Sequence, residues 1–133
     1  SQPEQDCAQL WRRIVFNILI SNTDDHLRNH GFLYGGAGGW RLSPAYDMNP
    51  TPVDVKARVL SLAIDEADDT ASLDVAFRMA RQCGLKQPAA REIVGEVQTA
   101  VAQWRNCAAS YGLNARDMAR MASAFEHEAA EGL

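Results

Sequence analysis

Apolar residues recur with helical spacing in the first twenty positions of the chain. Seven fall at i, i+3, i+4, i+7, i+8, i+11 and i+12, namely Cys7, Leu10, Trp11, Ile14, Val15, Ile18 and Leu19. This spacing predicts an amphipathic helix within residues 6–22, with Arg12 and Arg13 on its other side. The pattern stops at residues 21–25, Ser-Asn-Thr-Asp-Asp, whose side chains favour turns and compete with the helix for backbone hydrogen bonds.

After the turn at residues 21–25, the apolar residues no longer follow helical spacing. Residues 30–34 and 40–42 are short strand candidates, and residues 35–39, Gly-Gly-Ala-Gly-Gly, can join them as a β-hairpin. Residues 43–52 contain three prolines, which predicts an ordered but irregular loop. Residues 59–64 form a third, more apolar strand candidate.

The second half of the chain predicts three helices rich in alanine. The first covers residues 71–82 and ends at Gly84, and Pro88 suits the first turn of the second. Asn114 can cap the third. The expected inward positions are Leu73, Ala76, Phe77 and Ala80 in the first helix, Ile93, Val94, Val97, Val101, Trp104, Ala108 and Tyr111 in the second, closed by Gly112, and Met118, Met121, Ala122 and Phe125 in the third.

These elements predict a mainly α fold with a small β-hairpin or sheet. We expect one domain over residues 1–133, in which a helix at 6–22 leads to loops around a hairpin at 23–52. A helical subdomain follows at 70–130. The length of 133 residues allows one core but not two full-sized domains, so a function that needs about 250 residues of scaffold can be only partly present.

The charge balance excludes some partners. The chain has 13 Lys plus Arg against 17 Asp plus Glu, a net charge of -4 and a pI near 5.3. This argues against a polybasic binder of nucleic acid or of membrane surfaces. The apolar run at 14–20 is interrupted by Asn17 and is too short to span a bilayer.

The cysteines and the N-terminus indicate a reducing compartment. Cys7, Cys83 and Cys107 are odd in number and widely spaced, which fits neither a disulfide framework nor a zinc site. Residues 1–6 lack the basic and apolar regions of a signal peptide. We therefore expect the protein in the cytoplasm.

Residues with chemical potential crowd into positions 22–49. They are Asn22, Asp24, Asp25, His26, Asn29, His30, Asp47 and Asn49. Each alone is explained by turn formation, but together they flank the predicted hairpin. In protein kinases a catalytic Asp is followed five residues later by a metal-binding Asn, and a later loop supplies a metal-binding Asp. Asp24, Asn29 and Asp47 have this order and spacing.

Residues 16–52, FNILISNTDDHLRNHGFLYGGAGGWRLSPAYDMNPTP, resemble the catalytic core of the HipA-like toxin kinases. These are serine/threonine kinases of bacterial toxin–antitoxin modules, with the signature N-T-D-x-H-x-K-N followed by L-x-P-x-Y-D. The helical remainder is similar to the C-terminal helical subdomain of that family. The resemblance implies the large lobe of a protein-kinase-like fold in a bacterial cytoplasmic protein.

The resemblance also implies roles for individual residues. Asp24 matches the catalytic base, and His26 matches a loop histidine that organises the loop. Asn29 and Asp47 match the Mg²⁺ ligands that hold the phosphates of ATP. Arg28 stands where the family often has Lys, so it keeps the positive charge but changes the geometry of any phosphate contact.

Parts of a kinase are missing from the sequence. A loop over the phosphates and a Lys that holds them normally precede the catalytic loop, and neither Lys56 nor Lys86 does so. The chain therefore looks like a C-terminal piece of a larger kinase, and we expect it to be inactive by itself. The resemblance implies a protein substrate such as an aminoacyl-tRNA synthetase, and a small DNA-binding antitoxin as a partner.

Two other functions remain open at this point. His26 and His30, with Asp24 and Asp25, could bind Zn²⁺ or Mn²⁺ for hydrolysis if that segment were helical. Alternatively, the chain could be a non-catalytic interaction module with a degenerate kinase site.

Overall fold

The computed structural model describes residues 2–55, 57, 59, 61 and 71–130. The described part of the chain is mainly helical with one two-stranded sheet, which confirms the predicted fold class. Of the predicted third strand at 59–64, residues 60 and 62–64 lie outside the described residues. No described helix has the length and apolar character needed to cross a membrane.

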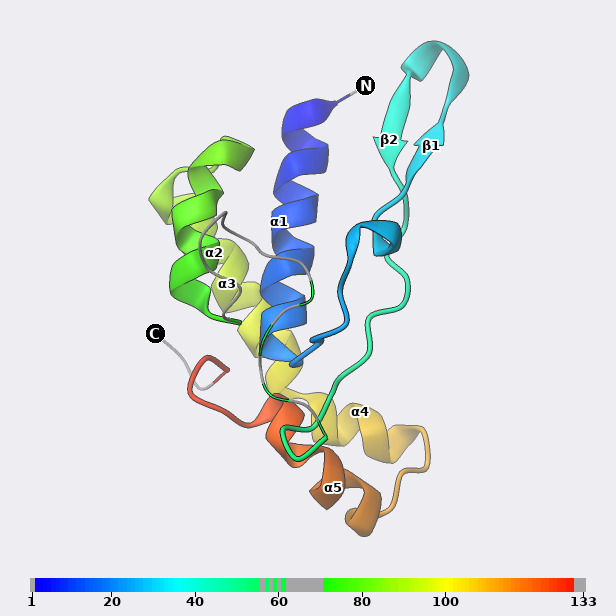
Figure 1. Cartoon of the computed structure of the whole chain (residues 1–133), viewed down its shortest axis with the longest axis vertical. Coiled ribbons are helices and arrows are strands. Elements are labelled where there is room, and N and C mark those ends of the chain that lie inside the picture. Colours follow the sequence, from blue (N-terminus) through cyan, green and yellow to red (C-terminus); the bar gives the residue numbers. More distant parts are fainter. Residues whose placement is uncertain (1, 56, 58, 60, 62–70, 131–133) are drawn as a thin grey trace.

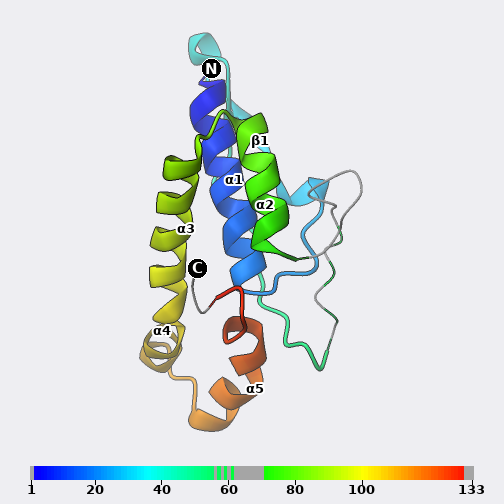
Figure 2. The same cartoon turned by 90° about the vertical axis from the view of Figure 1, so that its left-hand side faces the viewer.

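The first helix, α1 (Pro3–Leu19), is the centre of the fold. It starts before the predicted 6–22 because Pro3 suits the first helical position. It ends at Leu19, because Ile20 caps the helix and Ser21 takes a left-handed backbone conformation. Trp11, Val15, Ile18 and Leu19 are fully buried against the helices α2 (Leu73–Ala80) and α3 (Gln87–Ala102). Figures 1 and 2 show these three helices side by side.

The contact between α1 and α2 includes a buried polar link. Nε1 of Trp11 donates a hydrogen bond of 2.8 Å to the carbonyl of Ala76. After α2 the chain forms a short 3₁₀ turn, Arg81–Cys83, and stops at Gly84, whose φ of 70° is left-handed. The predicted stop at this glycine is therefore confirmed.

The prediction of one continuous helix through residues 93–111 was wrong. The chain breaks at Gln103 into α3 and a shorter helix, α4 (Trp104–Ser110), so Tyr111 is 83% exposed rather than inward. Trp104 is half-buried and stacks on Phe125, with ring centroids 4.5 Å apart. Phe125 ends the last helix, α5 (Ala115–Phe125), which the Asn114 side chain caps as predicted.

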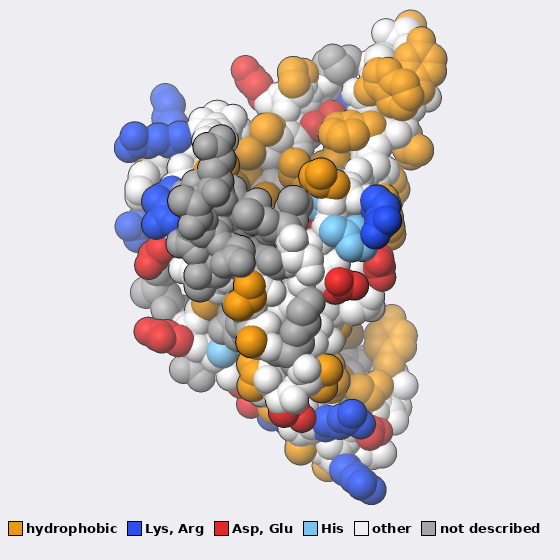
Figure 3. All heavy atoms as spheres, in the orientation of Figure 1, with side chains coloured by type: hydrophobic (Ala, Val, Ile, Leu, Met, Phe, Trp, Pro, Cys, Tyr) orange, Lys and Arg blue, Asp and Glu red, His pale blue; other side chains and the backbone are white. Residues whose placement is uncertain are grey.

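The hairpin consists of β1 (Phe32–Tyr34) and β2 (Trp40–Leu42), paired antiparallel, with a 3₁₀ turn at Gly36–Gly38. It confirms both predicted hairpin strands. Arg41 on β2 holds Asp6 on α1 through Nε and Nη2 at 3.0–3.1 Å, which places the hairpin beside the first half of α1. Its apolar side chains stay exposed, as Figure 3 shows: Phe32, Leu33, Tyr34 and Trp40.

Candidate active site

A tight turn carries the chain from α1 to the polar loop. Ser21 is fully buried and has a left-handed φ of 55°, and its hydroxyl donates to the carbonyl of Ala124 at 2.9 Å. Asn22 binds back to Asn17 of α1 through its backbone N–H at 2.8 Å and its side-chain amide at 3.0 Å. These buried contacts fix the direction in which the next residues leave the helix.

The two neighbouring aspartates that follow have different surroundings. Asp24, the predicted catalytic base, is exposed and makes no hydrogen bond to a described residue. Asp25 is 7% exposed and binds Nε2 of His30 at 2.8 Å. Asp25 therefore makes a contact within the loop, while Asp24 is open to solvent.

A single 3₁₀ turn, Leu27–Asn29, places Asn29 under the loop. The backbone N–H of His26 donates to Oδ1 of Asn29 at 3.0 Å, and the N–H of Asn29 donates to the carbonyl of His26 at 2.8 Å. His26 thus helps to organise the turn through its backbone. The side chain of Asn29 is held in one orientation and is 6% exposed.

Asp47 lies beside Asn29, although 18 residues separate them along the chain. Nδ2 of Asn29 donates to Oδ2 of Asp47 at 2.8 Å, and Nδ2 of Asn49 donates to Oδ1 at the same distance. Asp47 itself has a left-handed φ of 57°, which Asp tolerates better than most residues. The backbone is thus held in a conformation that turns this carboxylate toward Asn29.

Two further contacts join the loop of Asp47 to the loop of Asn29. The hydroxyl of Tyr46 donates to the carbonyl of Arg28 at 2.7 Å, and the N–H of Ser43 donates to the carbonyl of Gly31 at 2.9 Å. A Cβ on Gly31 would lie 3.3 Å from Oγ of Ser43, so this close approach favours glycine. The Arg28 guanidinium is exposed, and its predicted phosphate contact stays a prediction.

The structure thus brings some predicted site residues together and leaves others apart. Asn29 and Asp47 are in direct contact, and Arg28 is joined to this pair through its backbone. No described hydrogen bond links Asp24 to any of them. Carboxylate and amide oxygens are hard ligands of the kind that Mg²⁺ prefers. The Asn29 amide turns its nitrogen to Asp47, and its oxygen accepts from the N–H of His26 but keeps a second lone pair.

The arrangement required for a zinc or manganese hydrolase is not found. The segment between His26 and His30 is a single 3₁₀ turn that ends in extended backbone, and His30 is already paired with Asp25. In the part of the chain that the structure describes, no three His, Cys, Asp or Glu side chains are grouped to hold a metal ion.

Comparison with known proteins identifies the family. The family model for the HipA-like C-terminal domain matches residues 1–104. The chain belongs to this family. It is 38% identical over 69 residues to "Putative kinase Y4dM" of Sinorhizobium fredii (strain NBRC 101917 / NGR234), a match covering 52% of this chain and 14% of that protein. It is 34% identical over 59 residues to a "Putative kinase" of Haemophilus influenzae (strain ATCC 51907 / DSM 11121 / KW20 / Rd), covering 42% and 17%.

The matched part of this HipA-like domain therefore spans about one sixth of the length of these relatives or less. No solved structure matches the chain. The domain is related to proteins named as putative kinases, and the matched family segment includes the predicted site residues Asp24, Asn29 and Asp47.

Sequence reasoning missed several side chains around this site. Arg13 was expected on the outer side of α1 but is buried, and Asn17 was treated only as an interruption of an apolar run. Asp25 was considered only as a zinc or manganese ligand, and its pairing with His30 was not expected. Arg13 and Asn17 are four residues apart on α1, so they lie on one face of the helix, and both are buried.

Proposed function

We propose that this HipA-like domain supplies the catalytic base and the metal ligands of a serine/threonine protein kinase. The observation that carries the proposal is the 2.8 Å contact between Asn29 and Asp47. It pairs two oxygen-bearing side chains next to a loop whose Asp24 carboxylate is exposed. That is the set of groups which phosphoryl transfer requires from the larger lobe of a kinase.

In the proposed reaction, Asp24 orients a serine or threonine hydroxyl of a protein substrate and accepts its proton. The hydroxyl oxygen forms a bond to the γ-phosphorus of ATP, the bond from that phosphorus to the β–γ bridging oxygen breaks, and ADP leaves. Asn29 and Asp47 would hold Mg²⁺ against the phosphates. When bound, this ion neutralises charge that develops on the phosphate oxygens.

His26 and Arg28 complete the proposed site. His26 keeps the turn of Asn29 in shape through the backbone hydrogen bonds described above. Arg28 is exposed, keeps a positive charge beside the turn, and can approach a phosphate oxygen from solvent.

We further propose that an ATP-binding lobe must join this domain before it is active. A phosphate-binding loop and its Lys do not precede Asp24 in the sequence, so the isolated chain should transfer no phosphate. By its family, the complete protein would be the toxin of a bacterial toxin–antitoxin module in the cytoplasm. Its partners would be a protein substrate, such as an aminoacyl-tRNA synthetase, and a small DNA-binding antitoxin.

The test uses the complete protein, [γ-³²P]ATP, Mg²⁺ and a protein acceptor. We expect Asp24→Asn to lower the rate by about 10²- to 10⁴-fold, the usual contribution of a positioned base. Asp74→Asn, an exposed change on α2, is the matched control and should keep the wild-type rate. Transfer by Asp24→Asn at the wild-type rate would show that the assigned base is wrong.

The competing hypothesis is that the domain is a non-catalytic interaction module with a degenerate kinase site. A degenerate site would bind no Mg²⁺–nucleotide in the complete protein, whichever acceptor is offered. Calorimetric titration with Mg²⁺ and a non-hydrolysable ATP analogue measures this directly. Binding that is lost in Asp47→Ala supports the kinase, and its absence from the wild-type protein supports the module.

A further inference from the structure

A buried arginine lies beneath the two loops of the site. Arg13 of α1 is 7% exposed, and its Nη2 donates a hydrogen bond to the carbonyl of Ser43. Its Nε and Nη1 are also buried, and neither has a hydrogen-bond partner among the described residues. A buried guanidinium is costly to desolvate, so a position that retains one requires a reason beyond packing.

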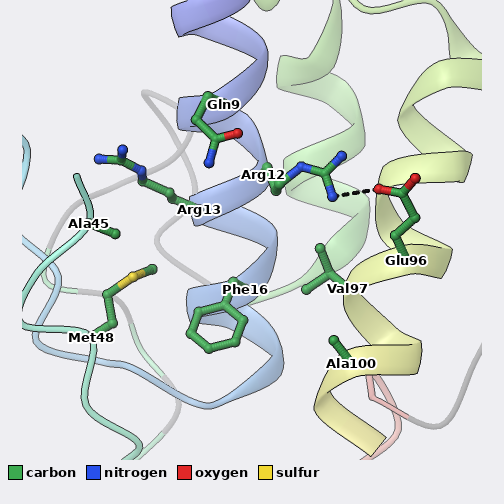
Figure 4. Close-up of a pocket in the computed structure, with 9 residues that line it drawn as sticks. All are labelled: Gln9, Arg12, Arg13, Phe16, Ala45, Met48, Glu96, Val97 and Ala100. Atoms are coloured by element: carbon green, nitrogen blue, oxygen red, sulfur yellow. Dashed lines mark ion pairs between the residues drawn. The ribbon is translucent and has the colours of Figure 1, made fainter. Parts of the chain in front are cut away.

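The neighbouring arginine on α1 has a different environment. Figure 4 shows Arg12 extending toward α3, where Nη1 lies 2.6 Å from Oε2 of Glu96, while Arg13 extends toward the loop that carries Ala45. A pocket of about 260 Å³ lies between α1, this loop and α3. One arginine therefore fastens α1 to a helix, and the other fastens it to the site.

Ser43 links Arg13 to the loops of the site. It is 7% exposed, and it stands at the end of β2, four residues before Asp47. Its N–H binds the carbonyl of Gly31, so the Arg13 contact reaches both loops at the point where they are joined. The Asn29–Asp47 contact belongs to the same joined unit.

The charge of Arg13 also faces the site. Arg13, Asp25, Asn29 and His30 line one small pocket between α1 and the loops. Asp25, which lines this pocket, is itself paired with His30. Arg13 thus borders the same small pocket as Asn29, one of the two proposed metal ligands.

We propose that Arg13 is a positioning residue that fixes the metal-binding loop on α1. This inference rests on the proposed kinase function, because it assigns Arg13 to the placement of the Mg²⁺ ligand Asp47. Arg13 touches neither substrate nor metal in this role. It acts through Ser43, and its loss lets the loop of residues 43–49 move relative to Asn29.

The test compares Arg13→Met, Arg13→Lys and Arg12→Met in the complete protein. We expect Arg13→Met to raise the Mg²⁺ concentration for half-maximal phosphate transfer by about tenfold, the size of one lost charged hydrogen bond. Arg13→Lys keeps one charged donor without the planar fork and should fall between Arg13→Met and wild type. Arg12→Met removes the adjacent cation and should leave the Mg²⁺ dependence unchanged.

A second readout does not depend on activity. Hydrogen–deuterium exchange in a peptide covering residues 43–49 should be faster in both Arg13 variants than in wild type and in Arg12→Met. If Arg13→Met does not fold, as judged by circular dichroism, Arg13→Lys decides alone.

Unchanged exchange and unchanged Mg²⁺ dependence in a folded Arg13 variant would overturn the inference. An equal response in Arg12→Met would overturn it as well. The wild-type complete protein could bind no Mg²⁺–nucleotide while the Arg13 variants still exchange faster at residues 43–49. That result would support Arg13 as the residue that holds this loop and would refute the proposed kinase function.

Discussion

Ser21 allows a sharp test of how the chain enters the site. Its backbone is left-handed at φ 55°, and its buried hydroxyl donates to Ala124 at 2.9 Å. Ser21→Ala keeps the unfavourable backbone and loses the hydrogen bond, which costs about 1 kcal/mol of the free energy of unfolding. Ser21→Gly also loses the bond, but it regains about 1.5 kcal/mol because glycine has no strain in the left-handed conformation. About 0.7 kcal/mol of this gain is lost because glycine makes the unfolded chain more flexible.

We therefore expect Ser21→Gly to stay within a few tenths of a kcal/mol of wild type, and Ser21→Ala to be about 0.8 kcal/mol less stable than Ser21→Gly. Urea unfolding followed by circular dichroism, fitted with a shared m-value, measures the difference. Ala119→Gly, in the exposed interior of α5, is the control in which glycine should cost about 1 kcal/mol. A Ser21→Ala protein as stable as Ser21→Gly would refute the assignment of strain to this turn.

Two further predictions concern titratable groups. Burial raises the pKa of Cys83 to about 12, with a smaller contribution from the neighbouring thiol of Cys7. Iodoacetamide at pH 8 should therefore alkylate the exposed Cys107 before Cys83. Peptide mass spectrometry that finds Cys83 modified first would contradict this prediction. The hydrogen bond from Arg41 lowers the pKa of Asp6, so this pair should stabilise the fold above about pH 4 and lose its effect as the pH falls through the lowered pKa. The difference in melting temperature between wild type and Asp6→Asn should therefore shrink on acidification, and a constant difference would show that the pair is not the cause.

The sequence was most informative where one physical rule dominated. The helical stripe in α1 and the glycine-rich tip between two short strands each predicted an element that the structure contains. The cap at Asn114 and the stop at Gly84 follow from local backbone chemistry and were also predicted. In these cases the pattern within a few residues was sufficient.

Prediction failed where the surroundings decided the outcome. The break at Gln103 redirects Trp104 onto Phe125, and a continuing apolar stripe does not reveal such a bend. Arg13 was placed outside because arginine is usually exposed, but α1 is covered by helices on one face and by the loops on the other. The pairing of Asp25 with His30 depends on the loop path, which the sequence does not determine.

The contact between Asn29 and Asp47 also has a consequence for how the chain folds. It closes a loop of 18 residues, whereas the bond between Trp11 and Ala76 in the core closes one of 65. Loop-closure entropy grows with the logarithm of length, so the site contact forms at about 1 kcal/mol less entropic cost than the core contact. In refolding, we expect the two loops to meet before α2 docks on α1, so the local geometry around Asp47 does not have to wait for the longest-range packing of the domain.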